Sequence, residues 1–261
     1  MTTISRTSTI NWHTRLRAAG VHLLLSAVVA AAAAVVVFAV WYPYPYREIS
    51  GGRELFLLVV TVDVILGPLI TLTIFDRRKS TRELVIDLAL VAAVQLSALS
   101  YGLWTVFVAR PVHLVFEIDR FRVVHAVDVP PQLLPNTPAG IEALPLSGPT
   151  LLAVRPFRDA GEKFDATMAA LGGAELGARP DFWQPYGAAR SRVQAVARPV
   201  ARLKQRFPAQ SARIDAVLRD AGRTPDTMAY VPLVGRKSFW TAFVDPANAD
   251  VVAFMPLDSF E

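Results

Sequence analysis

The stretch AAGVHLLLSAVVAAAAAVVVFAVWY, from Ala18 to Tyr42, decides the fold class because it carries no Asp, Glu, Lys or Arg. A helix needs about 20 apolar residues to cross the hydrocarbon core of a bilayer, and this stretch exceeds that length. It also exceeds the apolar core of a signal peptide, which is about 7–15 residues long. Aromatic side chains gather at its end, as is typical of a membrane interface. We therefore predict an uncleaved membrane span over residues 18–42.

Two further apolar stretches follow, Leu55–Phe75 and Leu84–Ala109. Each has the length that a membrane-spanning helix requires. The chain is therefore predicted to have three transmembrane α-helices and a C-terminal α+β soluble domain. The expected boundaries are a tail at 1–17, a transmembrane region at 18–109 with spans at 18–42, 55–75 and 84–109, and a soluble domain at 110–261.

The orientation follows from the basic residues beside the spans, because cytoplasmic loops carry an excess of Lys and Arg. The loop between the first two spans has Arg47 and Arg53. The tail and the second loop are richer, with Arg6, Arg15, Arg17, Arg77, Arg78, Lys79 and Arg82. This pattern predicts a cytoplasmic N-terminus and, after three crossings, a soluble domain on the far side. In a bacterium the protein would be a multi-pass inner-membrane protein with a periplasmic domain.

Residues 110–261 read as a domain long enough to bury its own core. Apolar alternation predicts strands at both ends of the domain and helices between them, which favours an α+β fold. Six prolines make residues 129–149 a loop without a regular element of its own. The expected strands are 112–118, 121–127, 150–155, 228–234, 239–244 and 251–255, and the expected helices are 159–171, 187–207 and 211–221.

The longest of these predicted helices, Gly187–Phe207, has an apolar stripe and a basic face, and Pro199 should kink it. Such a helix usually places its stripe on a core and its charges in water. The alternative is contact with anionic lipid or an acidic partner. The basic residues concerned are Arg190, Arg192, Arg198, Arg202, Lys204 and Arg206.

The residue inventory argues against several kinds of chemistry. The chain has no cysteine, which excludes disulfides, thiolate metal sites and Cys nucleophiles. Its four histidines have no metal-ligand spacing, and no G-x-S-x-G motif is present. The net charge of +5 is explained by basic residues beside spans, so nucleic acid is not an expected partner. We expect no cofactor, no metal and no catalytic residue.

A polar side chain inside a membrane span costs free energy, so such a residue indicates a contact or a function. The predicted spans contain two of interest, Asp63 and Gln95. At about 1.5 Å per residue, Asp63 lies about 18 Å from the Phe75 end of its span, and Gln95 lies about 16 Å from Leu84. The matched depths predict that Asp63 and Gln95 pair across the hairpin. A docking role toward a partner and a proton-relay role are the alternatives.

Several motifs occur together in a fixed order, from the first span to the last strands. They are Trp41-Tyr42-Pro43, Gly51-Gly52, Asp63-Val64 with Leu66-Gly67-Pro68, Ala109-Arg110-Pro111-Val112 and Tyr230-Val231-Pro232-Leu233-Val234-Gly235-Arg236. In these stretches the chain resembles the TfpX/TfpZ family of type IV pilin accessory proteins. The resemblance covers residues 15–127 and 226–258, and little of the region between them.

That resemblance implies a non-enzymatic, chaperone-like protein of the inner membrane that supports the stability, assembly or surface display of type IV pilin. Its expected partners are membrane lipid and a type IV pilin. The alternative is a membrane-bound transferase that modifies pilin at the periplasmic face, with Glu117, Asp119 and His125 as candidate catalytic groups. A sensor is a third possibility, but the cytoplasmic parts are too short for an output module.

Overall fold

The computed structural model describes residues 12–75 and 79–260. The basic residues Arg6, Arg77 and Arg78, which support the predicted orientation, lie outside these ranges. The chain divides into two compact units. We call them the helical unit, residues 12–37 and 54–106, and the sheet unit, residues 38–53 and 107–260.

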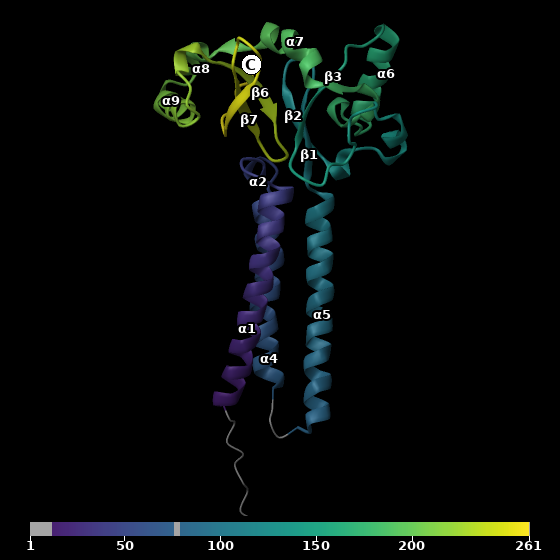
Figure 1. Cartoon of the computed structure of the whole chain (residues 1–261), viewed down its shortest axis with the longest axis vertical. Coiled ribbons are helices and arrows are strands. Elements are labelled where there is room, and N and C mark those ends of the chain that lie inside the picture. Colours follow the sequence, from purple (N-terminus) through teal and green to yellow (C-terminus); the bar gives the residue numbers. More distant parts are fainter. Residues whose placement is uncertain (1–11, 76–78, 261) are drawn as a thin grey trace, which may run out of the picture. The chain divides into compact units, whose positions relative to one another are not determined.

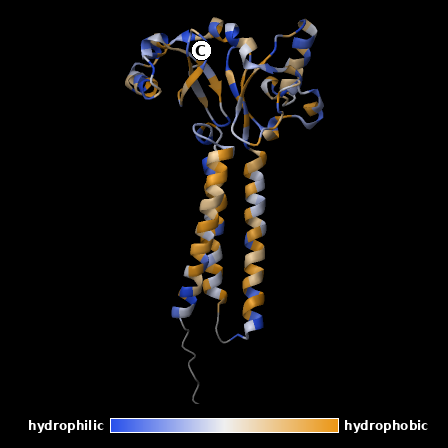
Figure 2. Cartoon of the chain, in the orientation of Figure 1, coloured by the Kyte–Doolittle hydropathy of each residue, from blue (hydrophilic) through white to orange (hydrophobic). Residues whose placement is uncertain are grey.

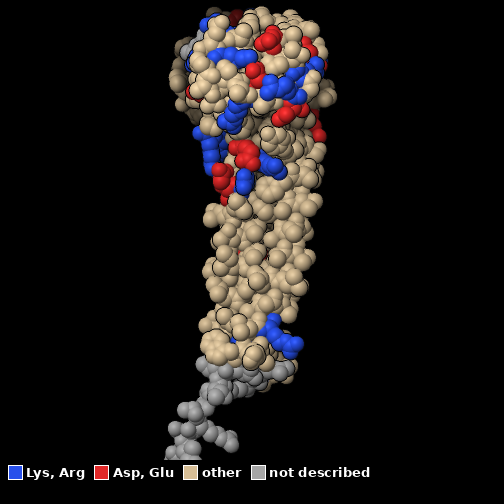
Figure 3. Space-filling model, turned by 90° about the vertical axis from the view of Figure 1, so that its left-hand side faces the viewer, with Lys and Arg blue, Asp and Glu red and all other residues tan. Residues whose placement is uncertain are grey.

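The helical unit is built from three long apolar helices, as the sequence predicted (Figures 1 and 2). Within the described residues, the stretches long and apolar enough to cross a membrane are Trp12–Trp41, Gly52–Ile74 and Thr81–Val108. The face seen in Figure 3 carries no charged side chain along most of these helices. The elements are α1 (Trp12–Val35), the π-helix η1 (Val36–Trp41), α3 (Gly52–Thr61), the π-helix η2 (Val62–Leu66), α4 (Gly67–Ile74) and α5 (Thr81–Val108).

The second apolar helix changes its geometry in the middle, where η2 joins α3 to α4. Pro68 has no backbone N–H, and its ring conflicts with the carbonyl of the residue four positions earlier, Val64. A wider π turn around Val64 accommodates that conflict without ending the helix. Asp63 lies in this turn and is buried.

The sheet unit contains one mixed sheet of eight strands in the order β4-β3-β1-β2-β6-β7-β8, with the short β5 paired to β6. The pairs β1–β3 and β2–β6 are parallel, and the other pairs are antiparallel. The strands are β1 (Pro111–Phe116), β2 (Phe121–His125), β3 (Thr150–Val154), β4 (Trp183–Pro185), β5 (Arg198–Pro199), β6 (Ala229–Val234), β7 (Phe239–Val244) and β8 (Val251–Met255).

Both faces of the sheet are covered, so the central strands are buried on both sides. One continuous core includes Leu114 and Val231 and is closed by Val193 of α7 (Arg190–Val196). The opposite face is divided in two (Figure 1). α6 (Ala160–Leu171) covers the part over β1 and β3, and α8 (Val200–Arg206) with α9 (Ser211–Asp220) covers the part over β6–β8. The α+β prediction is confirmed.

The segment between the first two apolar helices belongs to the sheet unit. It contains the short helix α2 (Tyr46–Ile49). The side chain of Ile49 is fully buried in the continuous core. Its carbonyl oxygen accepts a hydrogen bond from the backbone N–H of Arg236, at 3.3 Å. Ile49 therefore contributes to a core whose other buried members come from residues 114–249.

The predicted helix Gly187–Phe207 is wrong as a single element. α7 ends at Val196, Arg198 and Pro199 form β5 against β6, and α8 starts at Val200. The residue before a proline is forced out of the helical region, so the chain is extended at the break rather than kinked. The six basic residues therefore lie on three elements and do not form one basic helix.

Two smaller predictions also need correction. Residues 129–149 contain a regular element after all, a 3-10 helix at Pro131–Asn136. The predicted strand 112–118 ends at Phe116, and Ile118 is exposed. A register shift between Pro111 and His113 places Val112 in a different core cluster from Leu114.

Candidate functional site

The structure brings Asp63 and Gln95 into contact in the helical unit. The side-chain amide of Gln95 donates through Nε2 to the backbone carbonyl oxygen of Asp63, at 3.0 Å. The acceptor is therefore the main chain, whereas the sequence argument paired two side chains. Oδ1 of Asp63 is buried and has no hydrogen-bond partner among the described residues. A buried polar atom without a partner costs about 1–3 kcal/mol, so this carboxyl group is a candidate for an external contact.

Gly67 makes the approach of Gln95 possible. A Cβ atom at position 67 would lie 1.8 Å from Nε2 of Gln95. Gly102 has the same role one helix away, since a Cβ there would lie 2.6 Å from Cγ1 of Val59. At Gly67 and at Gly102 the absence of a side chain leaves room for a side chain of the neighbouring apolar helix.

A groove of about 260 Å³ opens beside Asp63, between α3, η2 and α5. Apart from Asp63 and Thr105, its lining is apolar or aromatic and includes Leu58, Val62 and Tyr101. Leu58 and Tyr101 are strongly exposed, as expected for side chains that face lipid or another helix. The groove therefore combines an apolar wall with one buried carboxyl group.

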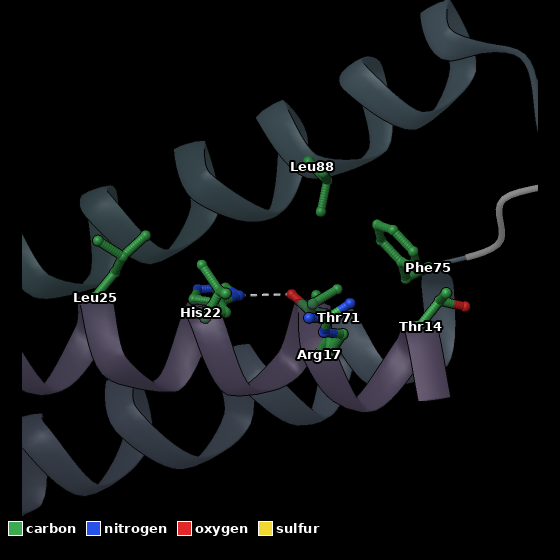
Figure 4. Close-up of a pocket in the computed structure, with 9 residues that line it drawn as sticks. Thr14, Arg17, His22, Leu25, Thr71, Phe75 and Leu88 are labelled. Carbon is green, nitrogen blue, oxygen red and sulfur yellow. Dashed lines mark hydrogen bonds between the residues drawn. The ribbon is translucent and has the colours of Figure 1, made fainter. Parts of the chain in front are cut away.

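A second cavity, of about 510 Å³, lies among the three apolar helices (Figure 4). His22 of α1 and Thr71 of α4 point toward each other in it, with Nδ1 and Oγ1 2.6 Å apart. Arg17, Phe75 and Leu88 also line it. His22 lies within the first predicted span, residues 18–42. No periodicity in a single helix could have shown that its partner is Thr71.

The basic residues predicted to contact lipid or a partner mostly bind groups of the sheet unit itself. Arg190 forms an ion pair with Asp250 at 2.9 Å, and Lys204 forms one with Asp215 at 2.9 Å. Arg192 donates to the carbonyl oxygen of Val154. These contacts tie α7 to β3 and to the loop before β8, and they tie α8 to α9.

The remaining three basic residues lie close to the break at Pro199 and at the end of α8. Arg206 donates to the carbonyl oxygen of Ser259 at 3.1 Å and so fixes the C-terminal segment. Arg198 is half-buried in β5, and Arg202 is exposed on α8.

The three residues of the transferase alternative do not converge. Glu117 is buried and accepts from Nε of Arg122 at 2.7 Å and from the backbone N–H of Gly177 at 2.9 Å. Asp119 is exposed and pairs with its neighbour Arg120. His125 lies at the other end of the β1–β2 hairpin, about 13 Å along the strand from Phe121.

His113 is a structural histidine. Its ring accepts from the hydroxyl of Thr150 at 2.6 Å on one side and donates to the carbonyl oxygen of Ala143 at 2.9 Å on the other. Burial lowers the pKa of His113 to about 4, so the ring is neutral at physiological pH. Across the described part of the chain, no group of three or more His, Asp or Glu side chains could hold a metal ion.

Comparison with known proteins gives a consistent result. Residues 10–51 match the family described as Fimbrial assembly protein FimB. Over 247 residues the chain is 34% identical to the fimbrial assembly protein of serogroup I from Dichelobacter nodosus, a match that covers 94% of this chain and 96% of that relative. The chain belongs to the fimbrial assembly protein family.

Other members of the fimbrial assembly protein family match as well. The serogroup E1 protein of Dichelobacter nodosus is also 34% identical over 247 residues, covering 94% of this chain and 96% of that relative. The protein of serogroups C1 and C2 is 42% identical over 113 residues, which is 43% of this chain and 86% of that relative. No solved structure matches the chain. The narrower likeness to TfpX/TfpZ proteins stays a prediction.

Proposed function

We propose that this member of the fimbrial assembly protein family is a non-enzymatic accessory protein of the bacterial inner membrane. It would support the stability, assembly or surface display of a type IV pilin, as the TfpX/TfpZ likeness implies. The observation that carries the proposal is the extent of the similarity to fimbrial assembly proteins. The match includes both the helical and the sheet unit, at 94% of this chain.

The composition of the sheet unit supports the proposed orientation. Residues 38–53 and 107–260 belong to one compact unit. Ile49 can be buried among residues of the sheet only if the first loop and the C-terminal domain lie on the same side of the membrane. Three crossings satisfy that condition. The basic residues of the tail and the second loop then favour a cytoplasmic N-terminus and a periplasmic sheet unit.

The groove beside Asp63 supports a direct role in the membrane. A pilin in the membrane presents one apolar helix and a periplasmic head. The apolar wall of the groove suits such a helix, and Oδ1 of Asp63 is left for a hydrogen-bond donor on it. The sheet unit would meet the pilin head on the periplasmic side.

The transferase alternative predicts a different response to mutation. Loss of a general acid or base typically lowers a rate by about 10²–10⁴-fold. A binding protein should lose activity gradually when one polar side chain changes. Glu117→Gln, Asp119→Asn and His125→Gln each keep the shape of the side chain and change its charge or basicity, so they separate the two mechanisms.

The test is complementation of a deletion strain with each variant, with surface pili counted and protein level checked by blot. We expect each variant that reaches normal level to retain substantial piliation. Asp63→Leu is the positive control for the docking groove and should reduce the amount of pilin recovered with the protein. Loss of pili in Asp119→Asn, at normal level and with pilin still bound, would contradict the proposal in favour of an enzyme.

A further inference from the structure

A polar pocket of about 380 Å³ lies in the sheet unit where β2 and β6 separate. The two strands are parallel but pair only at Phe121 with Leu233 and at Arg122 with Val234. β6 ends at Val234, whereas β2 continues to His125. Neighbouring parallel strands that end at different points leave a crevice at their carboxyl ends, which is where ligands bind in many α/β sheets. The wall opposite comes from residues 173–178.

His125 lines this pocket and has one unused nitrogen. The side chain is 2% exposed. Both its Nδ1 and its backbone N–H donate to Oδ2 of Asp128, at 2.9 and 3.1 Å. Burial alone would raise the pKa of Asp128, but the hydrogen bonds from His125 and the charge of Arg236 lower it overall. The carboxylate can therefore only accept, so Nδ1 carries a proton and the ring is held in one orientation.

Nε2 of His125 is buried and has no hydrogen-bond partner in the part of the chain that the structure describes. Most buried polar atoms in proteins are paired, so an unpaired one that lines a pocket points to a ligand atom. The sequence predicted a strand over residues 121–127, whereas β2 ends at His125 and a 3-10 helix at Ala126–Asp128 brings Asp128 to the His125 ring.

One cation at the pocket forms no ion pair with a carboxylate of the described residues. Arg122 is already engaged, by Glu117 at 2.7 Å and by Glu175 at 3.3 Å. Asp128 is engaged by His125. Arg236 is exposed and forms no ion pair within residues 12–75 and 79–260, which leaves its guanidinium as the cation available to a ligand.

We propose that this pocket binds a phosphate group, held by the guanidinium of Arg236 and by Nε2 of His125, with Asp128 keeping the imidazole in place. A guanidinium matches phosphate geometry with two parallel hydrogen bonds. A protonated phosphate oxygen can donate to a neutral Nε2, and an ionised one can accept from an imidazolium. Phosphate can therefore form a hydrogen bond with Nε2 whether the His125 ring is neutral or protonated.

The phosphate could belong to a lipid headgroup or to a small molecule in solution. Two pocket residues have backbone partners that are close in the chain to the ends of the apolar helices. His125 pairs with Pro111, three positions after the last residue of α5, and Arg236 bonds to Ile49, eight positions after Trp41. The experiment therefore needs one arm for each source.

The first arm uses the purified full chain in neutral detergent with ¹⁵N-labelled histidine. Sodium phosphate is titrated in, with sodium chloride at matched ionic strength as reference, and His125→Gln identifies the His125 signals. We expect a saturable shift of the His125 ring nitrogens. Arg236→Gln should weaken phosphate binding at least about tenfold, since charge-assisted hydrogen bonds of this kind are the strong ones. Lys237→Gln, which removes a neighbouring positive charge, should leave the binding curve unchanged.

The second arm places the chain in nanodiscs of phosphatidylcholine or of phosphatidylcholine with phosphatidylglycerol, without free phosphate. If the ¹⁵N chemical shifts of the His125 ring change in nanodiscs relative to phosphate-free detergent, the source is a lipid headgroup. If they change only when free phosphate is added, the source is a soluble ligand. Both results support the site. Absence of a His125 shift in both arms overturns the proposal. Equal weakening by Arg236→Gln and Lys237→Gln also overturns it, because binding would then reflect general surface charge.

Discussion

Replacement of Gly67 by alanine would place a methyl carbon where the amide of Gln95 now lies. The added Cβ would be 1.8 Å from Nε2, 2.5 Å from Cδ and 2.8 Å from Oε1 of Gln95. Contacts this short do not occur in folded proteins, so the Gln95 side chain would have to leave its position. It would then lose its 3.0 Å hydrogen bond to the carbonyl oxygen of Asp63.

The expected loss of stability can be assembled from three contributions. Overpacking costs about 1–3 kcal/mol, and the cost here should be close to about 1 kcal/mol because the new methyl group meets the end of the flexible, half-buried Gln95 side chain. The lost hydrogen bond adds about 0.6 kcal/mol, the average for membrane helices. Alanine regains up to about 1 kcal/mol of helix propensity over glycine. Together these contributions predict that Gly67→Ala lowers the free energy of unfolding by about 0.6–1.6 kcal/mol.

The measurement is SDS-induced unfolding of the purified protein in mixed micelles, followed by circular dichroism. Gly20→Ala is the matched control, because an added Cβ on this α1 glycine meets nothing within 4 Å. Gln95→Ala should rescue Gly67→Ala, so the double variant should be more stable than the sum of the single effects by about 1 kcal/mol. A Gly67→Ala protein as stable as the control, or strict additivity with Gln95→Ala, would refute the packing argument.

Three further predictions follow from the same contacts and charges. Asp63→Leu and Gln95→Leu should couple by less than about 0.5 kcal/mol in a double-mutant cycle, since Gln95 bonds to the main chain of residue 63; stronger coupling would show a contact with the carboxyl group. His113 has its pKa lowered from 6.5 to about 4 by burial, so the unfolded state takes up the proton first. Stability should be level above the unfolded pKa of about 6.5 and fall by up to about 3 kcal/mol toward pH 4, and urea unfolding of His113→Gln should show a flatter pH profile. Reporter fusions at Arg78 should behave as cytoplasmic, and fusions after Pro138 or at Glu261 as periplasmic; periplasmic activity at Arg78 would reverse the proposed orientation.

The sequence predicted well whatever depends on local pattern alone. A charge-free run such as residues 18–42 has few alternatives to a membrane-spanning helix. The helix at Ala160–Leu171 is equally local, because Asp159 caps it by accepting from the backbone N–H of Glu162 at 2.8 Å. Depth counting placed Asp63 and Gln95 at one level, and the structure brings them into contact, although with a different acceptor.

The failures occur where two local signals conflict or where a partner is distant in the sequence. The apolar stripe of residues 193–203 continues across Pro199, and this continuity led to the prediction of a single helix. In the structure Val193 belongs to one core cluster and Leu203 to another, on opposite faces of the sheet. The open end of β2 beside His125 likewise depends on where β6 stops, more than 100 residues later. No pattern within a single segment contains that information.

The burial of Ile49 has a consequence for how the protein is made and handled. During synthesis this residue leaves the ribosome well before the strands that enclose it, so the domain can close only after the third helix has been inserted. A recombinant fragment limited to residues 110–261 would lack this side chain and would forfeit about 1.5–3 kcal/mol of apolar burial. A secretable version of the domain should therefore carry residues 38–53 joined by a flexible linker to residue 107, rather than begin at the end of the last helix.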